Sequence, residues 1–314
     1  GIVKTADIGL PKELLGKIES DITEVDEQIS ESWLPKRNPE SHKGTYGHVA
    51  VVGGAYGMLG APVLSACGAG KSGAGLVTVV SAADIMLPLA CRMPEIMCRP
   101  LSCESGFLST ANTDEIAEFI ADKIVVMGMG MGRNDDTLRL VNKLCRSKMR
   151  SLVLDADGLY ALAKHPVNFK DIGLQAVLTP HPKEMAVLLN YSTAEIQADR
   201  LAAVQRASEK FGAVVVLKGA KTLTADGKKI YLNSTGNAGM ATGGSGDVLS
   251  GVIGSLLAQG LPAAKAAALG VYVHGLAGDI AKKKLGEYGM TAGDLPKNLP
   301  YAFLALANEQ INKK

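Results

Sequence analysis

Residues 48–81 read HVAVVGGAYGMLGAPVLSACGAGKSGAGLVTVVS, and this stretch contains one strand–helix–strand unit. It begins with HVAVVGG (48–54), a short apolar and β-branched run that ends in glycine, which is typical of a buried strand. Small residues dominate 59–74, where a helix is expected, and LVTVVS (76–81) predicts the next strand. This order is typical of a parallel sheet covered by helices.

The same alternation continues to the end of the chain. Further strands are predicted at 123–130, 151–157, 176–181 and 213–220, and further helices at 135–148, 192–212, 246–259, 262–285 and 294–312. Residues 222–233 predict a hairpin with a tight turn at Asp226-Gly227. Because the strands are apolar throughout, the sequence predicts an α/β fold with a mainly parallel sheet and helices on both faces. Ligands of such folds bind at the carboxyl ends of the strands.

The composition excludes several classes of protein. The 314 residues are 47% hydrophobic and 20% charged, which allows a large core and argues against disorder. The formal net charge of +2 gives no electrostatic reason to expect a nucleic acid or a membrane surface as a partner. The uncharged run 49–70 is long enough to cross a bilayer, but its glycines and Pro62 favour a buried strand and helix.

The cysteines indicate a reducing compartment. They are Cys67, Cys91, Cys98, Cys103 and Cys145. Their number is odd and the chain has no C-x-x-C pair, so we expect reduced thiols in a cytoplasmic protein. The close spacing of the second to fourth cysteines lacks the ligand pairing of a metal cluster, which makes such a cluster the weaker interpretation.

Residues 1–40 differ from the rest of the chain. They are polar and charged up to Trp33, and the following LPKRNPESHKG (34–44) is linker-like, with two prolines. We therefore expect an N-terminal segment over 1–40, which leads into or packs on an α/β domain over 41–314.

A glycine-dense run precedes the helix predicted at 246–259. Gly243-Gly244-Ser245-Gly246-Asp247 contains a single carboxylate, and the backbone N–H groups at a helix N-terminus favour phosphate binding. Asp247 is explained as a helix cap or a partner of the helix dipole, or as a general base that takes a proton from a substrate hydroxyl beside a bound phosphate. The spacing alone leaves both interpretations open.

At this point a family resemblance becomes specific. NSTGNAGMATGGSGDVLSGVIGSLLAQG (233–260) closely resembles the signature of the ADP/ATP-dependent NAD(P)H-hydrate dehydratases, a branch of the ribokinase-like fold. Further blocks resemble that family in its order, at 41–54, 60–79, 154–157, 178–185 and 217–222. The resemblance implies a three-layer α/β/α sandwich with a mainly parallel central sheet. TADIGLPKEL (5–14) resembles the tail of the hydrate epimerase domain that often precedes the dehydratase in one chain.

The resemblance also implies a reaction. The enzymes of the family act on the S-form hydrate of NADH or NADPH, phosphorylate its C6 hydroxyl from ADP or ATP, and eliminate phosphate to restore the ring. Hydroxide is a poor leaving group and phosphate a good one, so the sequence of steps is chemically sound. We expect Mg²⁺ as cofactor and ADP as the phosphoryl donor, with ATP as the alternative. The family further implies a homo-oligomer, a tetramer or larger.

Site roles follow residue by residue from the same resemblance. Asp247 is expected to be the catalytic base and to contact the hydrate, together with Ala61, Gly130, His181 and Asn237. The adenine nucleotide is expected on Lys218, Gly219, Ala220, Lys221, Thr222 and Gly246. The backbone of Gly243, Gly244, Ser245 and Gly246 is expected to form an anion hole. Glu184 is expected to organise the metal, supported by Asp155 and Asp157.

Each of these residues also has a structural explanation. Lys218 is explained as a solvated lysine at a strand end, and His181 as a capping or buried imidazole. Glu184 suits the first turn of a helix, where an acid complements the dipole. Asn237 is interpreted as a loop-shaping residue or a ligand contact. The sequence also departs from the family at MGMGMG (127–132), where a G-P-G-L-G type block is usual, although the glycines match.

Other functions stay open at this stage. A small-molecule kinase of the same fold, acting on a vitamin-precursor alcohol, shares the Gly-Ser-Gly-Asp block. A non-catalytic nucleotide-binding sensor is a second alternative, and the retained Asp247 argues against it. A nicotinamide oxidoreductase is the weakest, because GGAYGMLG (53–60) lacks the G-x-G-x-x-G fingerprint.

Overall fold

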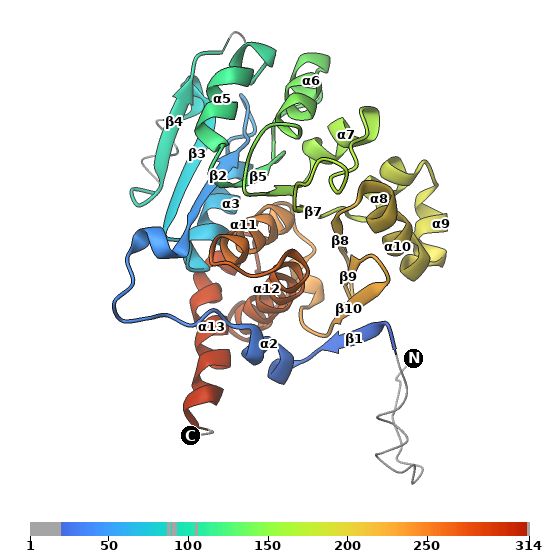
Figure 1. Cartoon of the computed structure of the whole chain (residues 1–314). Helices are drawn as coiled ribbons and strands as arrows, with labels where there is room; N and C mark the ends of the chain where they lie inside the picture. Colours follow the sequence, from blue (N-terminus) through green and yellow to red (C-terminus); the bar gives the residue numbers. More distant parts are fainter. Residues whose placement is uncertain (1–19, 87–88, 90–92, 104–105, 313–314) are drawn as a thin grey trace.

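The computed structural model describes residues 20–86, 89, 93–103 and 106–312. These residues form one central sheet with helices packed against it (Figure 1). The strands are β1 (Ile22–Val25), β2 (His48–Val52), β3 (Leu76–Ala82), β4 (Met97–Leu101), β5 (Ile124–Met127), β6 (Ser151–Leu154), β7 (Ala176–Leu178), β8 (Val214–Leu217), β9 (Leu223–Asp226) and β10 (Lys229–Asn233). Their order in the sheet is β1-β10-β9-β8-β7-β6-β5-β2-β3-β4.

Neighbouring strands are parallel except where β9 pairs antiparallel with both β8 and β10. The predicted hairpin is thereby confirmed, as is the mainly parallel sheet. The two-residue turn of the hairpin is Gly227-Lys228, one residue later than the predicted Asp226-Gly227, because Asp226 still belongs to β9. The predicted strands at 48–54, 76–81 and 123–130 correspond to β2, β3 and β5. Parallel strands with one direction bring their carboxyl ends to one edge of the sheet, where the functional residues are expected.

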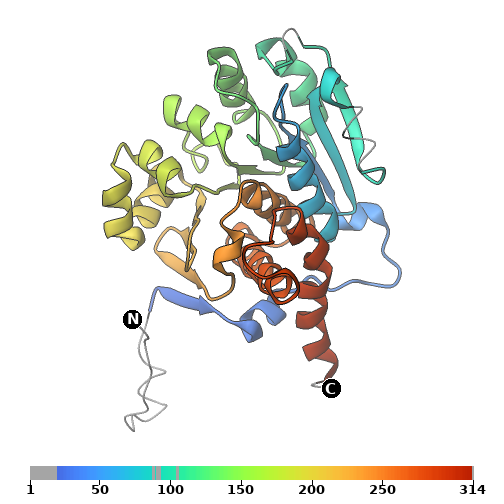
Figure 2. The same ribbon diagram turned by 180° about the vertical axis from the view of Figure 1, so that it is seen from behind.

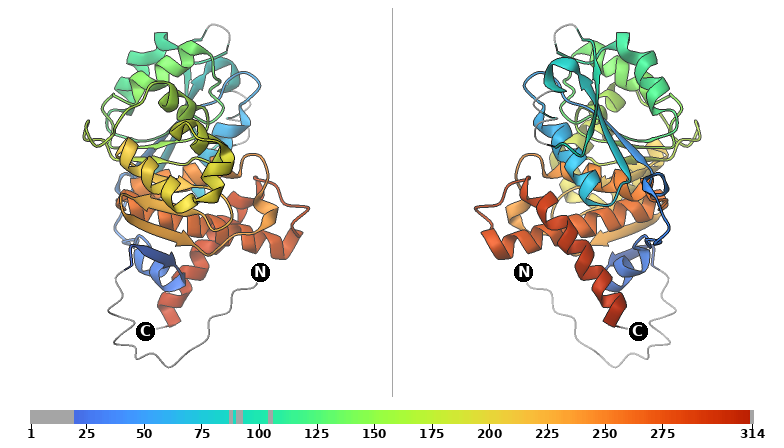
Figure 3. Two further views of the ribbon diagram at one scale, coloured as in Figure 1. Left: turned by 90° about the vertical axis from the view of Figure 1, so that its right-hand side faces the viewer. Right: turned by 90° about the vertical axis from the view of Figure 1, so that its left-hand side faces the viewer.

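Two layers of helices cover the sheet, as Figure 3 shows from the side. One layer contains α2 (Glu27–Trp33), α3 (Gly60–Lys71), α11 (Ser245–Ala258), α12 (Ala263–Leu285) and α13 (Asp294–Asn312). The other contains α5 (Thr113–Ile120), α6 (Asp135–Leu144), α7 (Asp157–Lys164), α8 (Pro182–Leu189), α9 (Thr193–Ala198) and α10 (Arg200–Phe211). Strand β2 shows why both faces of the sheet are covered. Val49 and Val51 face the first layer of helices, whereas Ala50 and Val52 face the second. Alternate side chains of a strand point to opposite faces, so an apolar strand needs cover on both.

The prediction of a single helix over 192–212 is wrong, because the helix is interrupted at Asp199. This residue has φ −142° and ψ 79°, outside the helical region, and separates α9 from α10. Its carboxylate accepts a hydrogen bond of 2.9 Å from the backbone N–H of Ala202. The side chain therefore caps the second helix instead of continuing the first, a preference that aspartate shows at helix starts.

Strands β1 and β4 at the two edges of the sheet were not predicted. β1 pairs in parallel with β10, and Trp33 of the following α2 lies edge-on to Tyr231 with ring centroids 5.6 Å apart. Part of the N-terminal segment therefore extends the sheet (Figure 1). The epimerase-like stretch 5–14 lies outside the described residues.

The long helices set the position of the glycine run. α11 packs tightly along α3, because a Cβ at Gly251 would collide with the backbone carbonyl of Ser65. α13 lies beside α12 and carries the C-terminus (Figure 2). The uncharged run 49–70 falls on β2 and α3, and no described helix is long and apolar enough to span a membrane.

The described cysteines, which are Cys67, Cys98, Cys103 and Cys145, form no disulfide with one another. Cys91 lies outside the described residues. Within the described part of the chain, no three histidine, cysteine, aspartate or glutamate side chains group together as a metal cluster would require.

Candidate active site

A cavity of about 900 Å³ opens at the carboxyl ends of β6, β7 and β8. Its wall is completed by the segment 233–242, the first turns of α11 and one face of α12. The predicted site residues that line it are His181, Glu184, Lys218, Gly219, Ala220, Lys221, Thr222, Asn237, Gly243, Gly244, Ser245, Gly246 and Asp247. A second cavity of about 860 Å³, between the N-terminal segment, α3 and α13, contains none of them.

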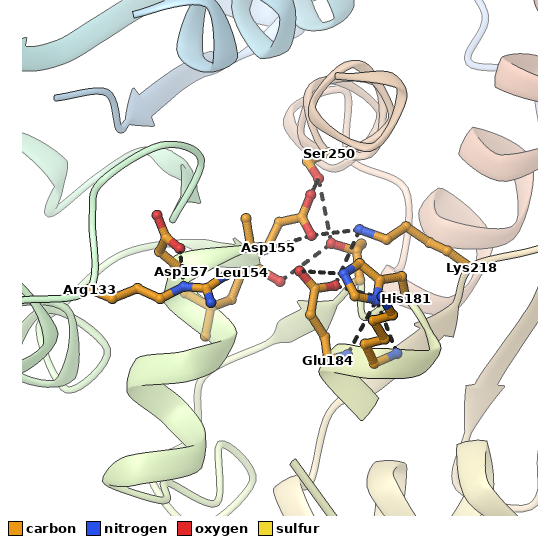
Figure 4. Close-up of polar contacts among 11 residues, drawn as sticks. Arg133, Leu154, Asp155, Asp157, His181, Glu184, Lys218 and Ser250 are labelled. Atoms are coloured by element: carbon orange, nitrogen blue, oxygen red, sulfur yellow. Dashed lines mark hydrogen bonds and ion pairs between the residues drawn. The ribbon is translucent and has the colours of Figure 1, made fainter. Parts of the chain in front are cut away.

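Lys218 lies at the centre of a cluster of carboxylates (Figure 4). Its Nζ is 2.8 Å from Oδ1 of Asp155 and 3.7 Å from Oε2 of Glu184. Burial lowers the pKa of Lys218, but the two carboxylates outweigh burial and leave it above its ordinary value. The ammonium group is therefore charged at any physiological pH. The interpretation of Lys218 as a solvated strand-end lysine is wrong, since its side chain is only 18% exposed.

Ser250 holds the other oxygen of Asp155. Its Oγ donates a hydrogen bond of 2.7 Å to Oδ2, while the backbone N–H of Ala156 donates one of 2.9 Å to Oδ1. Both side chains are buried, so the Asp155 carboxylate is fixed against Lys218. Sequence reasoning missed Ser250. The available signal was its position one helical turn after Asp247, which directs both side chains to the same side of α11.

His181 and Glu184 cap each other at the start of α8. The backbone N–H groups of Lys183 and Glu184 donate to Nδ1 of His181 at 3.0 and 3.3 Å. Oε2 of Glu184 in turn accepts 2.8 Å from the backbone N–H of His181. Because Nδ1 accepts, the neutral imidazole carries its hydrogen on Nε2. Burial and the charge of Lys218 lower the pKa of His181, which favours this neutral form.

Both roles weighed for His181 and Glu184 are thus compatible. They cap α8, and they also line the cavity. Burial raises the pKa of Glu184, and the nearby Lys218 opposes this rise.

The glycine run begins α11 at the cavity wall. Gly244 has φ +94°, and a Cβ there would lie 2.5 Å from Cδ1 of Leu64, so only glycine fits. A Cβ at Gly246 would lie 3.1 Å from Nζ of Lys218, which places this backbone directly beside the ammonium group. The first N–H groups of a helix have no partners within the helix and attract anions. The arrangement therefore suits a phosphate between the run and Lys218.

Asp247 stands in the first turn of α11 with a perturbed acidity. Burial and the neighbouring Asp155 raise its pKa to about 7, against an opposing effect of Lys218. A carboxylic acid with this pKa exchanges its proton near neutrality, as a general base must. Among the described residues, no backbone N–H of α11 donates a hydrogen bond to the Asp247 carboxylate, so Asp247 does not act as a side-chain cap.

The strand-end loop after β8 forms another part of the wall. Arg200 donates to the carbonyls of Leu217 and Ala220 at 3.1 and 2.6 Å. Thr222 Oγ1 donates 2.8 Å to the carbonyl of Gly219. These bonds fix the backbone of the predicted nucleotide loop, and residues 219–222 of the loop line the cavity.

Asn237 lines the cavity, but its amide also shapes the loop. Nδ2 donates 2.9 Å to Oδ1 of Asp279 on α12, and Oδ1 accepts 3.0 Å from the backbone N–H of Gly239. Sequence reasoning missed Asp279 and also His274, a buried α12 residue that lines the same cavity.

Ala61 and Gly130 lie outside the residues that line this cavity. They adjoin each other, because a Cβ at Gly130 would be 3.3 Å from Cβ of Ala61. Leu64, one turn further along α3, contacts the Gly244 position. The two residues thus form a neighbouring surface beyond the glycine run. Asp157, which was expected to support the metal site, does not line this cavity. Its carboxylate instead accepts hydrogen bonds from Nε of Arg133 at 2.7 Å and from the backbone N–H of Gly132 at 2.9 Å.

The family model described as NAD(P)H-hydrate dehydratase (Carb_kinase) matches residues 49–301. The chain belongs to the NAD(P)H-hydrate dehydratase family. It is 44% identical to the ADP-dependent (S)-NAD(P)H-hydrate dehydratase of Neisseria meningitidis serogroup B, over 82% of this chain and 86% of that protein. The resemblance drawn from the sequence motifs is thereby confirmed.

Longer relatives of this dehydratase family carry a second activity in their names. The chain is 42% identical to the bifunctional NAD(P)H-hydrate repair enzyme Nnr of Moorella thermoacetica, over 98% of this chain. It spans 59% of that relative's length, and 51% of the corresponding enzyme of Coxiella burnetii.

Solved structures confirm the ribokinase-like fold. The ADP/ATP-dependent NAD(P)H-hydrate dehydratase of Bacillus subtilis, co-crystallised with ATP and Mg²⁺, superposes with a TM-score of 0.77 at 26% identity, over 90% of this chain and 97% of that one. A hydroxyethylthiazole kinase of Pyrococcus horikoshii matches with a TM-score of 0.54 at 16% identity, over 82% of this chain and 89% of that one, which shows the fold alone. The comparisons thus support the dehydratase family over the small-molecule kinase.

Proposed function

We propose that this chain catalyses the ADP-dependent dehydration of the S-form hydrate of NADH or NADPH. One observation carries the proposal: Asp247, with a pKa of about 7, adjoins a glycine run at a helix N-terminus inside a large cavity. A base and an anion cradle side by side are what phosphorylation of a hydroxyl requires. The family membership and the name of the N. meningitidis relative support the same substrate.

In the first step Asp247 takes the proton of the C6 hydroxyl. The hydroxyl oxygen forms a bond to the terminal phosphorus of ADP, and the bond from that phosphorus to the leaving AMP oxygen breaks. Backbone N–H groups of 243–246, at the positive end of α11, offset the charge that develops on the moving phosphoryl group. Their position is set before the reaction, so they cost no reorganisation at that moment.

In the second step the C6–O bond of the phosphate ester breaks and phosphate leaves. The electron pair of the ring nitrogen forms a double bond to C6 as phosphate leaves. The C5 proton is then lost to the departing phosphate or to water, and its bonding pair forms the C5=C6 double bond while the nitrogen regains its pair, which restores NADH or NADPH. The imidazole of His181 lines the cavity, and its Nε2, which carries the hydrogen, lies 3.5 Å from Oε1 of Glu184. We assign the imidazole, with Asn237, Ala61 and Gly130, to binding of the hydrate.

Lys218 and the loop 219–222 are assigned to the adenine nucleotide. The Lys218 ammonium is held charged by its carboxylate neighbours and adjoins Gly246, so it can contact phosphate oxygens without moving far. Its fixed partners Asp155 and Glu184 make it a positioned charge instead of a mobile one.

Mg²⁺ fits this donor set. The ion usually binds one or two carboxylates together with substrate phosphates, and Glu184, which lines the cavity, would supply such a carboxylate. Both oxygens of Asp155 already accept hydrogen bonds, so Asp155 would support the site through Lys218. When bound it would neutralise charge on the nucleotide phosphates. We further propose a cytoplasmic homo-oligomer, tetrameric or larger. We also propose that an epimerase domain precedes this chain, because residues 5–14 resemble the tail of such a domain and the chain spans 59% of a bifunctional relative.

The proposal is tested by Asp247→Asn, with Asp171→Asn as a matched control at an exposed position. Hydrate dehydration in the presence of ADP and Mg²⁺ should fall by about 100-fold or more in the first variant, because the base is lost. ADP affinity should change little, and the control should match the wild type. Near-normal turnover in Asp247→Asn would contradict the assigned role. Phosphorylation of a vitamin-precursor alcohol without hydrate turnover would favour the kinase alternative.

A further inference from the structure

One face of α12 has no role in the chemistry proposed above. The helix carries VYVHGLAGD (271–279), in which His274, Gly275, Gly278 and Asp279 recur at spacings of three and four. Residues spaced in this way share one helix face. This face lies against the segment 234–245, which forms a wall of the candidate active-site cavity.

Asp279 holds the beginning of that wall segment. Its Oδ2 accepts 2.9 Å from the backbone N–H of Gly236, and its Oδ1 accepts 2.9 Å from Nδ2 of Asn237. Asn237 in turn fixes the backbone of Gly239, because its Oδ1 accepts a hydrogen bond of 3.0 Å from the N–H of that residue. A single α12 carboxylate therefore orders four consecutive residues.

His274 holds the end of the segment. Its Nε2 lies 3.0 Å from the carbonyl oxygen of Ser245, and since a carbonyl only accepts, Nε2 must donate. Burial lowers the pKa of His274 to about 4, so the ring stays neutral at physiological pH. Ser245 in turn donates from Oγ to the carbonyl of Met240 at 2.8 Å.

Between these two ends the segment packs directly on glycine. A Cβ at Gly275 would collide with Oγ1 of Thr235, and a Cβ at Gly278 would collide with the sulfur of Met240. Thr235 also donates 2.8 Å to the carbonyl of Tyr272. The absence of side chains at these two positions lets the segment approach the helix closely.

We propose that Asp279 and His274 are positioning residues that clamp the segment 236–245 to α12 and so fix the anion hole and Asp247. The inference rests on the proposed function of this site. Glycine-rich backbone loses much conformational freedom when it is ordered, so a phosphate cradle built from it needs external support. The clamp supplies this support before any ligand binds.

The hydrogen-bond pattern allows a test by exchange of partners. Asp279→Asn sets two amide NH₂ groups against each other, and Asn237→Asp sets two carboxylates against each other. In the double variant, the amide introduced on α12 can donate to the carboxylate introduced on the loop and still accept from Gly236, so all three bonds can re-form. Asp136→Asn is the matched control, because Asp136 accepts a backbone and a side-chain bond from Thr110 and a weaker one from Arg139, outside the cavity lining.

We expect each single variant to lower kcat/KM for the hydrate, and to weaken ADP binding in calorimetry, by about 10- to 100-fold. The double variant should recover most of the ADP affinity, whereas its kcat/KM for the hydrate should stay low, because Asn237 is also assigned to hydrate binding. The control should lose neither. Unchanged single variants, or a double variant whose ADP affinity is no better than that of the worse single one, would overturn the clamp. If the wild type lacks dehydratase activity, the proposed function fails while the ADP affinities still test the clamp.

A second pair guards against variants that do not fold. His274→Gln keeps an N–H donor near the position of Nε2, whereas His274→Leu removes it. ADP affinity should be retained in the glutamine variant and lost in the leucine variant. Equal affinities in two folded variants would contradict the role of His274.

Discussion

Replacement of Asp247 by asparagine is expected to stabilise the fold while it removes activity. The folded protein holds this carboxylate at a pKa of about 7, against an ordinary value of 3.8. Ionised Asp247 is therefore unfavourable in the folded state, through burial and the nearby Asp155. Asparagine has a similar shape without the charge, so it resembles the protonated acid.

The size of the effect depends on pH. Above about pH 7, Asp247 is ionised in both states, and the difference between the two pKa values corresponds to about 4 kcal/mol against folding. Because the side chain is partly exposed to the cavity, we expect the asparagine variant to gain about half of this, about 2 kcal/mol. As the pH falls toward about 4, the folded wild type takes up a proton that the unfolded chain does not, so the gain shrinks.

Urea unfolding at several values between about pH 5 and pH 8 measures this difference as a free energy. The Asp171→Asn variant serves as control, because it makes the same chemical change at an exposed position. We expect the stabilisation by Asp247→Asn to be largest at the alkaline end and to decline steadily toward the acid end. A variant less stable than the wild type at about pH 8, or a gain independent of pH, would refute the reasoning.

Three further predictions follow from the same cluster. The kcat/KM for the hydrate should fall about tenfold per pH unit below about pH 7, as Asp247 becomes protonated; a flat profile between about pH 5 and pH 7 would contradict its role as base. Lys218→Met should lower the free energy of unfolding by about 3 kcal/mol and raise the Kd for ADP, because it leaves two buried carboxylates without their cation. Urea unfolding measures the first quantity and calorimetry the second, and a variant with wild-type values of both would contradict this role of Lys218. Ser250→Ala should lower the free energy of unfolding by about 1–3 kcal/mol, because Asp155 loses a buried donor; equal stability in urea would argue against that bond.

The central fold was predictable because its strands are short, apolar and β-branched. HVAVV and IVVM form β2 and β5 where the pattern indicated them. The edge strands were not predictable from the same pattern. β4 reads MCRPL, with a charge and a proline, because an edge strand needs neither full burial nor every backbone donor. The break at Asp199 was missed because its capping bond competes locally with an otherwise continuous helical pattern.

The candidate site was predictable in its parts but not in its connections. The family resemblance, carried by motifs at strand ends and by the glycine run, identified Lys218, Glu184 and Asp247 as site residues, and all three line the cavity. The bond between Lys218 and Asp155 joins positions 63 residues apart, and no spacing rule gives such a distance. His274 and Asp279 on α12 were missed because sequence alone gives a histidine or an aspartate on a long helix no link to a distant loop. Such residues more often lie exposed to solvent or have a structural role than line a site.

The most direct test of the account follows the near-ultraviolet absorbance of the reduced nicotinamide ring. Purified protein would be mixed with the S-form hydrate of NADH and Mg²⁺, with ADP, with ATP or with no nucleotide. We predict that absorbance rises with ADP and that no rise occurs without a nucleotide. No rise with either nucleotide, from protein shown to be folded and to bind ADP, would contradict the assignment of this cavity as a hydrate dehydratase site.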